Sequence, residues 1–218
     1  MPQITSIEPQ KKKKNRFNVF LDGQFAFGID ENTLVKNRLK VGQILAKNQV
    51  EKLIKETIIG KLMDQSLRFL SYRPRSEKEI VTYLVQKIAR TENIKYQEAK
   101  QSPLIDTVIR KLKRYKYLDD RQFAKWLVNS RIKSGSRSPF FIKQELISKG
   151  ISKETIGVVL GRYPDQRVLA RRAVEKKLKK WQGLSQIDLK KKIYAYLAGR
   201  GFDFQTIKEV FAFLTKKS

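Results

Sequence analysis

The residues best suited to chemistry in this chain are two adjacent carboxylates, Asp119 and Asp120, in a stretch rich in aromatic and basic residues. Paired carboxylates can hold the metal ions of phosphoryl-transfer enzymes. They can also begin a helix, because Asp is a favoured N-cap and a second acid in the first turn is stabilised by the helix dipole. Successive helical residues point about 100° apart, and the other acids nearby are Asp106, Glu145 and Glu154. The sequence therefore favours a helix start over a catalytic pair.

The residues around this pair fit a helix start. With Asp119 as the N-cap, Leu118 and Phe123 have the spacing of the hydrophobic contact that often accompanies such a cap. Ser76 and Glu79 predict another helix start, because a serine N-cap and a glutamate three residues later can accept backbone N–H groups from each other.

Other routes to catalysis find little support. The chain has no cysteine and no histidine, which excludes disulfides, zinc sites of the Cys/His type, cysteine nucleophiles and histidine bases. Ser130 with Lys133 and Ser134 with Arg137 are possible nucleophile pairs, but such pairs arise freely in a lysine-rich chain. No glycine-rich phosphate loop is present. We therefore expect no enzyme activity, no cofactor and no metal.

The charge of the chain points to a binding function. The 48 Lys and Arg residues outnumber 21 Asp and Glu residues, which gives a formal net charge of +27. The excess is distributed, with +5 in residues 1–60, +8 in 61–118, +4 in 119–160 and +10 in 161–218. A folded protein of this charge attracts polyanions or an acidic protein partner.

The sequence has no feature of a membrane or exported protein. No apolar run approaches the roughly 20 residues of a transmembrane helix, and the basic N-terminal run is followed by no apolar core of a secretory signal. The lack of cysteine suits a reducing cytosol. We expect a cytoplasmic protein that does not contact a membrane.

The elements expected at the N-terminus are strands. Apolar and polar residues alternate over residues 17–21 and again over 25–29, and Asp22-Gly23 between them is typical of a two-residue hairpin turn. Residues 4–29 are thus expected to be strands, with the lysines 11–14 in a loop that either binds phosphate or is merely solvated. After Gly28 the pattern becomes helical, and Pro74 ends a first long helix.

Three segments in the helical part share one pattern: residues 79–87, 141–150 and 192–201. Each has apolar residues four apart and a base three residues later: Ile80, Leu84 and Lys87; Ile142, Leu146 and Lys149; Ile193, Leu197 and Arg200. The last two end in a base followed by glycine, which is typical of a helix C-terminus. An apolar helix precedes each segment and another follows it, so the pattern predicts repeated three-helix units.

The expected fold is mainly α. Tandem three-helix repeats stack because one unit cannot bury its apolar face alone, and we expect an elongated curved body with a small N-terminal β-hairpin or sheet. The expected domains are the N-terminal hairpin with its leading helices and three repeats, over residues 1–60, 61–117, 118–163 and 164–218.

Two basic segments are candidate contact surfaces. The loop at 131–140 ends in Ser138-Pro139, which predicts a helix start whose amides either receive a phosphate or carboxylate or belong to a flexible loop. The segment 170–181 contains a single acid, Glu175, and is either a contact face or a solvated one. Trp126 and Trp181 stand among apolar neighbours and are expected in the core. The candidate partner- or DNA-binding residues are Arg73, Arg75, Arg131, Lys133, Arg137, Lys149, Arg171, Arg172, Lys176, Lys179 and Lys180.

Taken together, these motifs resemble the RecX regulatory proteins of bacteria. The matching stretches are "RPRSEKEIVTYL" from Arg73, "YLDDRQFA" from Tyr117, and "ELISKGI" from Glu145. The likeness covers about residues 60–215 and is loosest in the third repeat, while the N-terminal part is similar to the extension of longer members. Ser136 departs from the pattern, in which a second glycine is expected near Gly135.

The resemblance implies a non-enzymatic modulator of the RecA recombinase in DNA recombination, repair and the SOS response. Such proteins are built of three-helix repeats, lie in the groove of the RecA–single-stranded DNA filament, and inhibit strand exchange, ATP hydrolysis and co-protease activity. The implied partners are therefore the RecA filament and its single-stranded DNA, bound by a monomer. Arg73, Arg131 and Lys149 match the family pattern and are polar. The alternative is a stand-alone DNA-binding protein that uses its three-helix units like helix-turn-helix modules.

Overall fold

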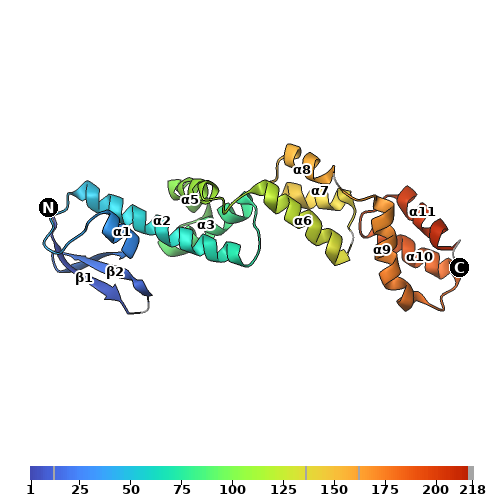
Figure 1. Cartoon of the computed structure of the whole chain (residues 1–218), viewed down its shortest axis with the longest axis horizontal. Coiled ribbons are helices and arrows are strands. Elements are labelled where there is room, and N and C mark those ends of the chain that lie inside the picture. Colours follow the sequence, from blue (N-terminus) through green and yellow to red (C-terminus); the bar gives the residue numbers. More distant parts are fainter. Residues whose placement is uncertain (12, 136, 162, 216–218) are drawn as a thin grey trace. The chain divides into compact units, whose positions relative to one another are not determined.

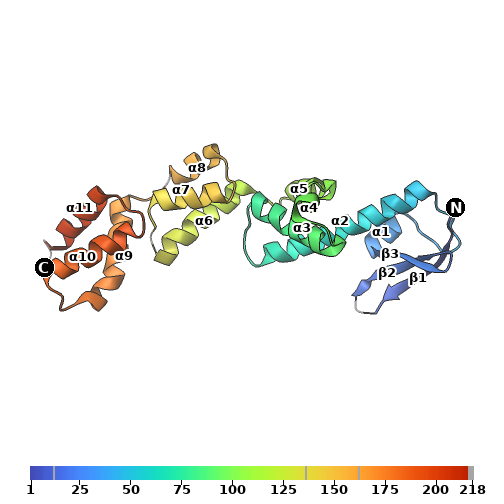
Figure 2. The same cartoon turned by 180° about the vertical axis from the view of Figure 1, so that it is seen from behind.

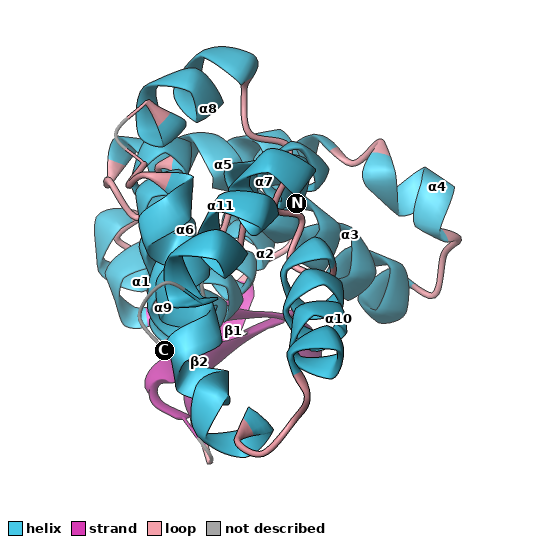
Figure 3. Cartoon of the chain, turned by 90° about the vertical axis from the view of Figure 1, so that its right-hand side faces the viewer, coloured by secondary structure: helices cyan, strands magenta, loops and turns pink. Residues whose placement is uncertain are grey.

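The structure is a computed structural model that describes residues 1–11, 13–135, 137–161 and 163–215 (Figure 1). Within these residues most of the chain is helical, and the strands are confined to the N-terminal part (Figure 3). The chain divides into two compact units: Met1–Arg73 with Val81–Tyr117, and Pro74–Ile80 with Leu118–Ser218. The prediction of a mainly helical protein with a small N-terminal sheet is confirmed.

The N-terminal sheet has three antiparallel strands in the order β1 (Ile4–Gln10), β2 (Lys13–Leu21) and β3 (Gln24–Asp30). Asp22 and Gly23 join β2 to β3 with φ values of 48° and 82°. Two central residues with positive φ match the twist of the flanking strands. The predicted hairpin is therefore confirmed, with one strand added.

The lysine run was expected in a loop, and that expectation is wrong for its second half. Lys13 pairs with Gln10, so β2 already includes Lys13 and Lys14. Lys12 and the side chains of Lys13 and Lys14 lie outside the described residues.

The sheet packs on the helices that follow it. The buried residues of this core come from the sheet, the following loop and helix α2: Ile4, Val19, Phe27, Ile29, Leu39, Leu45 and Leu53. Asp30 caps the short α1 (Glu31–Lys36) by accepting the N–H of Thr33. Helix α2 (Lys47–Ser71) runs unbroken through residues 60 and 61. The boundary predicted between residues 60 and 61 therefore falls inside this helix.

The first unit also contains most of α3 (Glu77–Glu92), with α4 (Tyr96–Lys100) and α5 (Pro103–Arg114). The polar insert that was predicted as a helix extension or a loop forms the end of α3, a turn at Asn93 and the five-residue α4 (Figure 2). The predicted apolar face of α5 is buried at Ile105, Val108 and Ile109.

The second unit contains two sets of three helices. One set is α6 (Asp120–Gly135), α7 (Pro139–Ser148) and α8 (Lys153–Leu160). The other is α9 (Gln166–Leu178), α10 (Gln186–Ala198) and α11 (Phe204–Thr215), with a 3-10 turn η1 (Lys179–Trp181) after α9. Each set surrounds its own apolar cluster. The tandem three-helix arrangement is therefore confirmed.

The repeat pattern has a direct structural meaning. Its two apolar positions are fully buried in every repeat, at Ile80, Leu84, Ile142, Leu146, Ile193 and Leu197. The residue one position before the second apolar one contacts the preceding helix or turn. Tyr83 stacks on Phe69 of α2 with ring centroids 4.3 Å apart, and Tyr196 packs edge-on against Trp181 of η1.

Candidate protein and nucleic-acid interface

The two aspartates both accept backbone N–H groups at the starts of helices. The Asp119 carboxylate accepts the backbone N–H groups of Arg121 and Gln122 at 2.8 and 3.0 Å, so the predicted N-cap is confirmed. Asp120 has a second role that the sequence did not suggest. Its Oδ1 accepts the N–H of Glu77 at 2.8 Å, which joins the start of α6 to the start of α3. No local pattern signals this bond, because the two residues are 43 positions apart.

The predicted capping box at the start of α3 is also confirmed. Ser76 Oγ accepts the N–H of Glu79, and Glu79 Oε2 accepts the N–H of Ser76, both at 3.3 Å. The other oxygen, Glu79 Oε1, accepts from Lys149 Nζ at 2.8 Å. Lys149 was a candidate contact residue. In the structure it holds the end of α7 against the start of α3.

Arg131, another candidate, forms a paired contact with Glu145. Arg131 Nε donates to Glu145 Oε2 at 2.8 Å and Nη2 donates to Oε1. The hydrogen bond from Arg131 lowers the pKa of the Glu145 carboxyl, and burial partly opposes it. A bidentate Arg–carboxylate pair of this kind is geometrically specific. The pair holds α6 against α7, and it engages the Arg131 guanidinium in a contact within the chain.

The glycines that follow the bases lie where neighbouring repeats touch. Gly150 and Gly201 have φ values of +81° and +78°, as predicted for left-handed residues after a helix. A Cβ on Gly150 would lie 3.0 Å from Cβ of Lys78, at the start of α3. A Cβ on Gly201 would lie 2.7 Å from Oγ of Ser138, at the start of α7. The base-glycine motif is thus a packing motif between repeats.

The start of α7, where an anion site was predicted, makes several contacts within the chain. Ser138 is fully buried, its Oγ accepts the N–H of Phe141, and its own N–H donates to the Arg200 carbonyl at 3.0 Å. Pro139 has no N–H. The N–H groups of Ser138 and Phe141 are therefore used inside the protein, which leaves fewer amides to receive a phosphate than the sequence suggested.

The loop before α7 is held by a further contact. The Tyr163 hydroxyl donates to the Arg137 carbonyl at 2.6 Å, and burial raises the pKa of Tyr163 to about 12. The side chains of Lys133 and Arg137 are exposed. Ser136 and the side chain of Ser134 lie outside the described residues.

Arg73 and Arg75 flank Pro74 between α2 and α3. Both are half-buried, and both interact with other residues of the chain. The match of Arg73 to the family pattern therefore coincides with contacts inside the chain, as it does for Arg131 and Lys149.

The remaining candidates lie on the third repeat and differ in their surroundings. Arg171 lies over the Phe213 ring with its Cζ 4.4 Å from the centroid. In contrast, the other four candidates on α9 and η1 are exposed: Arg172, Lys176, Lys179 and Lys180. We call these four the α9 basic face. With Lys133 and Arg137, they are the predicted site residues whose side chains are exposed.

The two tryptophans lie in the helical cores. Trp126 and Trp181 are partly buried against the clusters of the second and third repeats, as predicted. Among the described residues, no group of three His, Cys, Asp or Glu side chains is placed to hold a metal ion. No helix in that part of the chain is both long and apolar enough to cross a membrane.

Comparison with protein families gives four matches in order along the chain. The regulatory protein RecX N-terminal domain matches residues 2–46. The first, second and third three-helix domains of RecX match residues 63–91, 119–160 and 165–211. The first match includes the N-terminal sheet, whereas the sequence motifs that resemble RecX lie in the helical part of the chain.

Individual relatives agree with the family matches. Regulatory protein RecX of Bacillus subtilis (strain 168) is 37% identical over 209 residues, which covers 95% of this chain and 75% of the relative. Regulatory protein RecX of Oceanobacillus iheyensis is 36% identical over 217 residues, covering 96% and 76%.

Solved structures show the same fold. A crystal structure of regulatory protein RecX aligns with a TM-score of 0.68 at 25% identity, over 96% of this chain and 98% of that one. RecX from Lactobacillus salivarius aligns over 72% and 96%, with a TM-score of 0.56 and 24% identity, and supports the fold alone. The sequence relatives and the ordered domain matches together show that this chain belongs to the RecX family of regulatory proteins.

Proposed function

We propose that the protein binds the filament that RecA forms on single-stranded DNA, as a monomer and without catalysis of its own, and that it inhibits the recombinase, ATPase and co-protease activities of RecA. The main support is membership of the RecX family over nearly the whole chain. The net charge of +27 adds a physical reason, since a filament of protein on DNA presents phosphates to a basic partner.

Two of the candidate contact residues already have partners within the chain. Arg131 and Lys149 are held in ion pairs with Glu145 and Glu79, and each pair bridges two helices. The α9 basic face has no such ion pairs among the described residues, and Glu175 is the one acid in its segment. We therefore place the contact to filament phosphate or to acidic protein groups on the α9 basic face.

The decisive assay is RecA ATP hydrolysis on single-stranded DNA, titrated with this protein from substoichiometric to equimolar amounts. Inhibition is the expected result, and inhibition well below equimolar amounts favours blocked filament growth over coating of the groove. An unchanged ATPase rate at every ratio would contradict the proposal. Tight binding to free DNA with that unchanged rate would favour the stand-alone DNA-binding protein.

Matched variants test the assigned face. Arg172→Gln with Lys176→Gln removes two exposed charges from α9 and should raise the concentration for half-inhibition roughly tenfold, because each exposed ion pair contributes about 0.2–1 kcal/mol and about 1.4 kcal/mol is a factor of ten. Lys191→Gln with Lys192→Gln removes two exposed charges from α10 of the same repeat and should have a much smaller effect. Equal losses from both pairs would show that net charge acts, and not this face.

A further inference from the structure

A buried arginine in the first unit lacks the partners that its charge requires. Arg16 on β2 is only 7% exposed. Its Nη2 is buried and has no hydrogen-bond partner among the described residues. Within the described ranges, the one ion pair of Arg16 is with Asp64, at 3.9 Å from Nη1, and the Asp64 side chain is 74% exposed. That distance is too long for a hydrogen bond.

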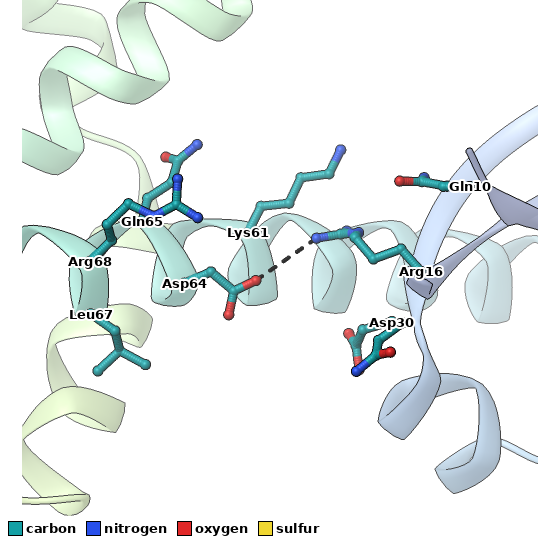
Figure 4. Close-up of a pocket in the computed structure, with 9 residues that line it drawn as sticks. Gln10, Arg16, Asp30, Lys61, Asp64, Gln65, Leu67 and Arg68 are labelled. Atoms are coloured by element: carbon teal, nitrogen blue, oxygen red, sulfur yellow. Dashed lines mark ion pairs between the residues drawn. The ribbon is translucent and has the colours of Figure 1, made fainter. Parts of the chain in front are cut away.

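This arginine faces a cavity between the sheet and α2. The cavity has a volume of about 840 Å³ and is lined by Gln10, Asn15, Arg16, Asp30, Lys61, Asp64, Gln65, Leu67 and Arg68. Figure 4 shows Arg16 reaching from the strand toward α2, where Lys61, Asp64, Gln65 and Arg68 stand along the helix. Positions three, four and seven residues apart share one face of a helix, so the sequence of α2 directs this group into the cavity.

The charges around the cavity favour an anion. Arg16, Lys61 and Arg68 contribute three positive charges, while the acids are Asp30 and Asp64. Both oxygens of Asp30 are already engaged, because they accept from the N–H and the hydroxyl of Thr33. Asp30 keeps its negative charge in these bonds, so the lining residues leave one positive charge in excess, and Asp64 lies outside hydrogen-bond distance of Arg16. A buried guanidinium nitrogen without a hydrogen-bond partner is unfavourable.

We propose that this cavity is a binding site for a phosphate group, with the Arg16 guanidinium at its base and Lys61 and Arg68 at its mouth. A guanidinium presents two parallel N–H groups that match the oxygens of a phosphate, and ammonium or guanidinium groups around it supply the remaining charge. The volume exceeds that of an isolated phosphate and falls in the range of ligand sites, about 300–1,000 Å³. The phosphate thus belongs to a free nucleotide or anion, or to a nucleic-acid strand that passes the cavity. The inference is independent of RecA, because it concerns the N-terminal unit by itself.

The test measures binding to the full chain without RecA. Inorganic phosphate, ATP and a short single-stranded oligothymidine are used as probes, with sodium chloride at equal ionic strength as the reference. We expect each phosphate-containing probe that enters the site to raise the unfolding temperature above the chloride reference. Arg16→Gln should weaken the binding of that probe at least about tenfold, as expected for loss of a charge-assisted hydrogen bond.

A second cavity variant keeps the test valid if Arg16→Gln does not fold. Lys61→Gln with Arg68→Gln changes two exposed residues at the mouth and should also weaken binding several-fold. Lys52→Gln with Lys55→Gln removes the same charge from exposed positions of α2 outside the cavity. This control should bind as the parent protein does.

The outcomes separate the sources of the phosphate. Binding of phosphate and ATP alone, lost in the cavity variants, assigns a free-anion or nucleotide site. Binding of the oligothymidine that depends on the same residues assigns a nucleic-acid strand. The proposal is overturned if no probe exceeds the chloride reference, or if the Lys52 and Lys55 control loses as much binding as the cavity variants. Because RecA is absent, none of these results depends on inhibition of its ATPase.

Discussion

Replacement of Gly201 by alanine tests the junction between the second and third repeats. Gly201 has a φ of +78°, in the left-handed region. An added Cβ would lie 2.7 Å from Ser138 Oγ and 2.8 Å from Phe141 Cδ1. Ser138 is fully buried and caps α7, so it cannot move aside without breaking that cap.

The expected loss in unfolding free energy has two parts. A left-handed backbone costs an alanine about 1–2 kcal/mol. Forcing a methyl group into a filled site costs about 1–3 kcal/mol more, which brings the expected loss for Gly201→Ala to about 2–5 kcal/mol. Gly183 provides the matched control, since it lies in the same repeat with a φ of +82° and no atom lies within 4 Å of an added Cβ. Gly183→Ala should therefore show the first part alone.

Urea unfolding followed by tryptophan fluorescence is a suitable assay, because Trp126 and Trp181 both lie in the second unit. The difference between the two variants isolates the packing part, about 1–3 kcal/mol. If Gly201→Ala costs no more than Gly183→Ala, then Ser138 and Phe141 do not lie against Gly201 in solution. The account of the base-glycine motif as a contact between repeats would then be wrong.

Three further predictions concern the second repeat. Gly157→Ala, in the middle of α8 with no atom within 4 Å of the added Cβ, should raise the unfolding free energy by about 0.5–1 kcal/mol in the same urea assay. Asp119→Ala should lower the unfolding free energy by about 1 kcal/mol, because the N-cap is lost. Asp119→Asn should keep most of the cap and leave RecA inhibition intact. A large loss of inhibition by the asparagine variant alone would point to a chemical role. The pKa of Glu145 is lowered in the folded state by its hydrogen bond from Arg131, so its contribution to stability is present above the unfolded-state value of 4.5 and disappears as the pH falls through the folded-state pKa. Arg131→Gln should flatten this acid dependence in unfolding experiments between neutral pH and acid, and an unchanged slope would contradict it.

Local patterns in the sequence determined most of the elements. The Asp22-Gly23 turn, the capping box at Ser76 and the N-cap at Asp119 all depend on residues close together in the chain. Such interactions recur wherever their residue types and spacing recur, because the backbone groups involved lie within one turn. The apolar periodicity likewise located the buried positions of each repeat, such as Ile142 and Leu146. The RecX resemblance rested on the same caps and core residues.

The roles of individual charged residues were decided only by the tertiary structure. Sequence spacing does not show that Lys149 pairs with Glu79, which is 70 positions away. Nor does it show that Asp120 accepts an N–H at the start of a helix of the preceding repeat. The hydrogen bond from the Ser138 N–H to the Arg200 carbonyl, in the turn after α10, is equally invisible in the spacing.

The buried Arg16 likewise gives no local signal, since one cation in a polar stretch looks like any other until a sheet and a helix enclose it. The physical reason is common to all these cases. A charged side chain has many possible partners along a basic chain, and its role depends on which of them lies within a few ångströms and on how much water is excluded. Folding sets both quantities, and neither is encoded in the spacing of neighbouring residues.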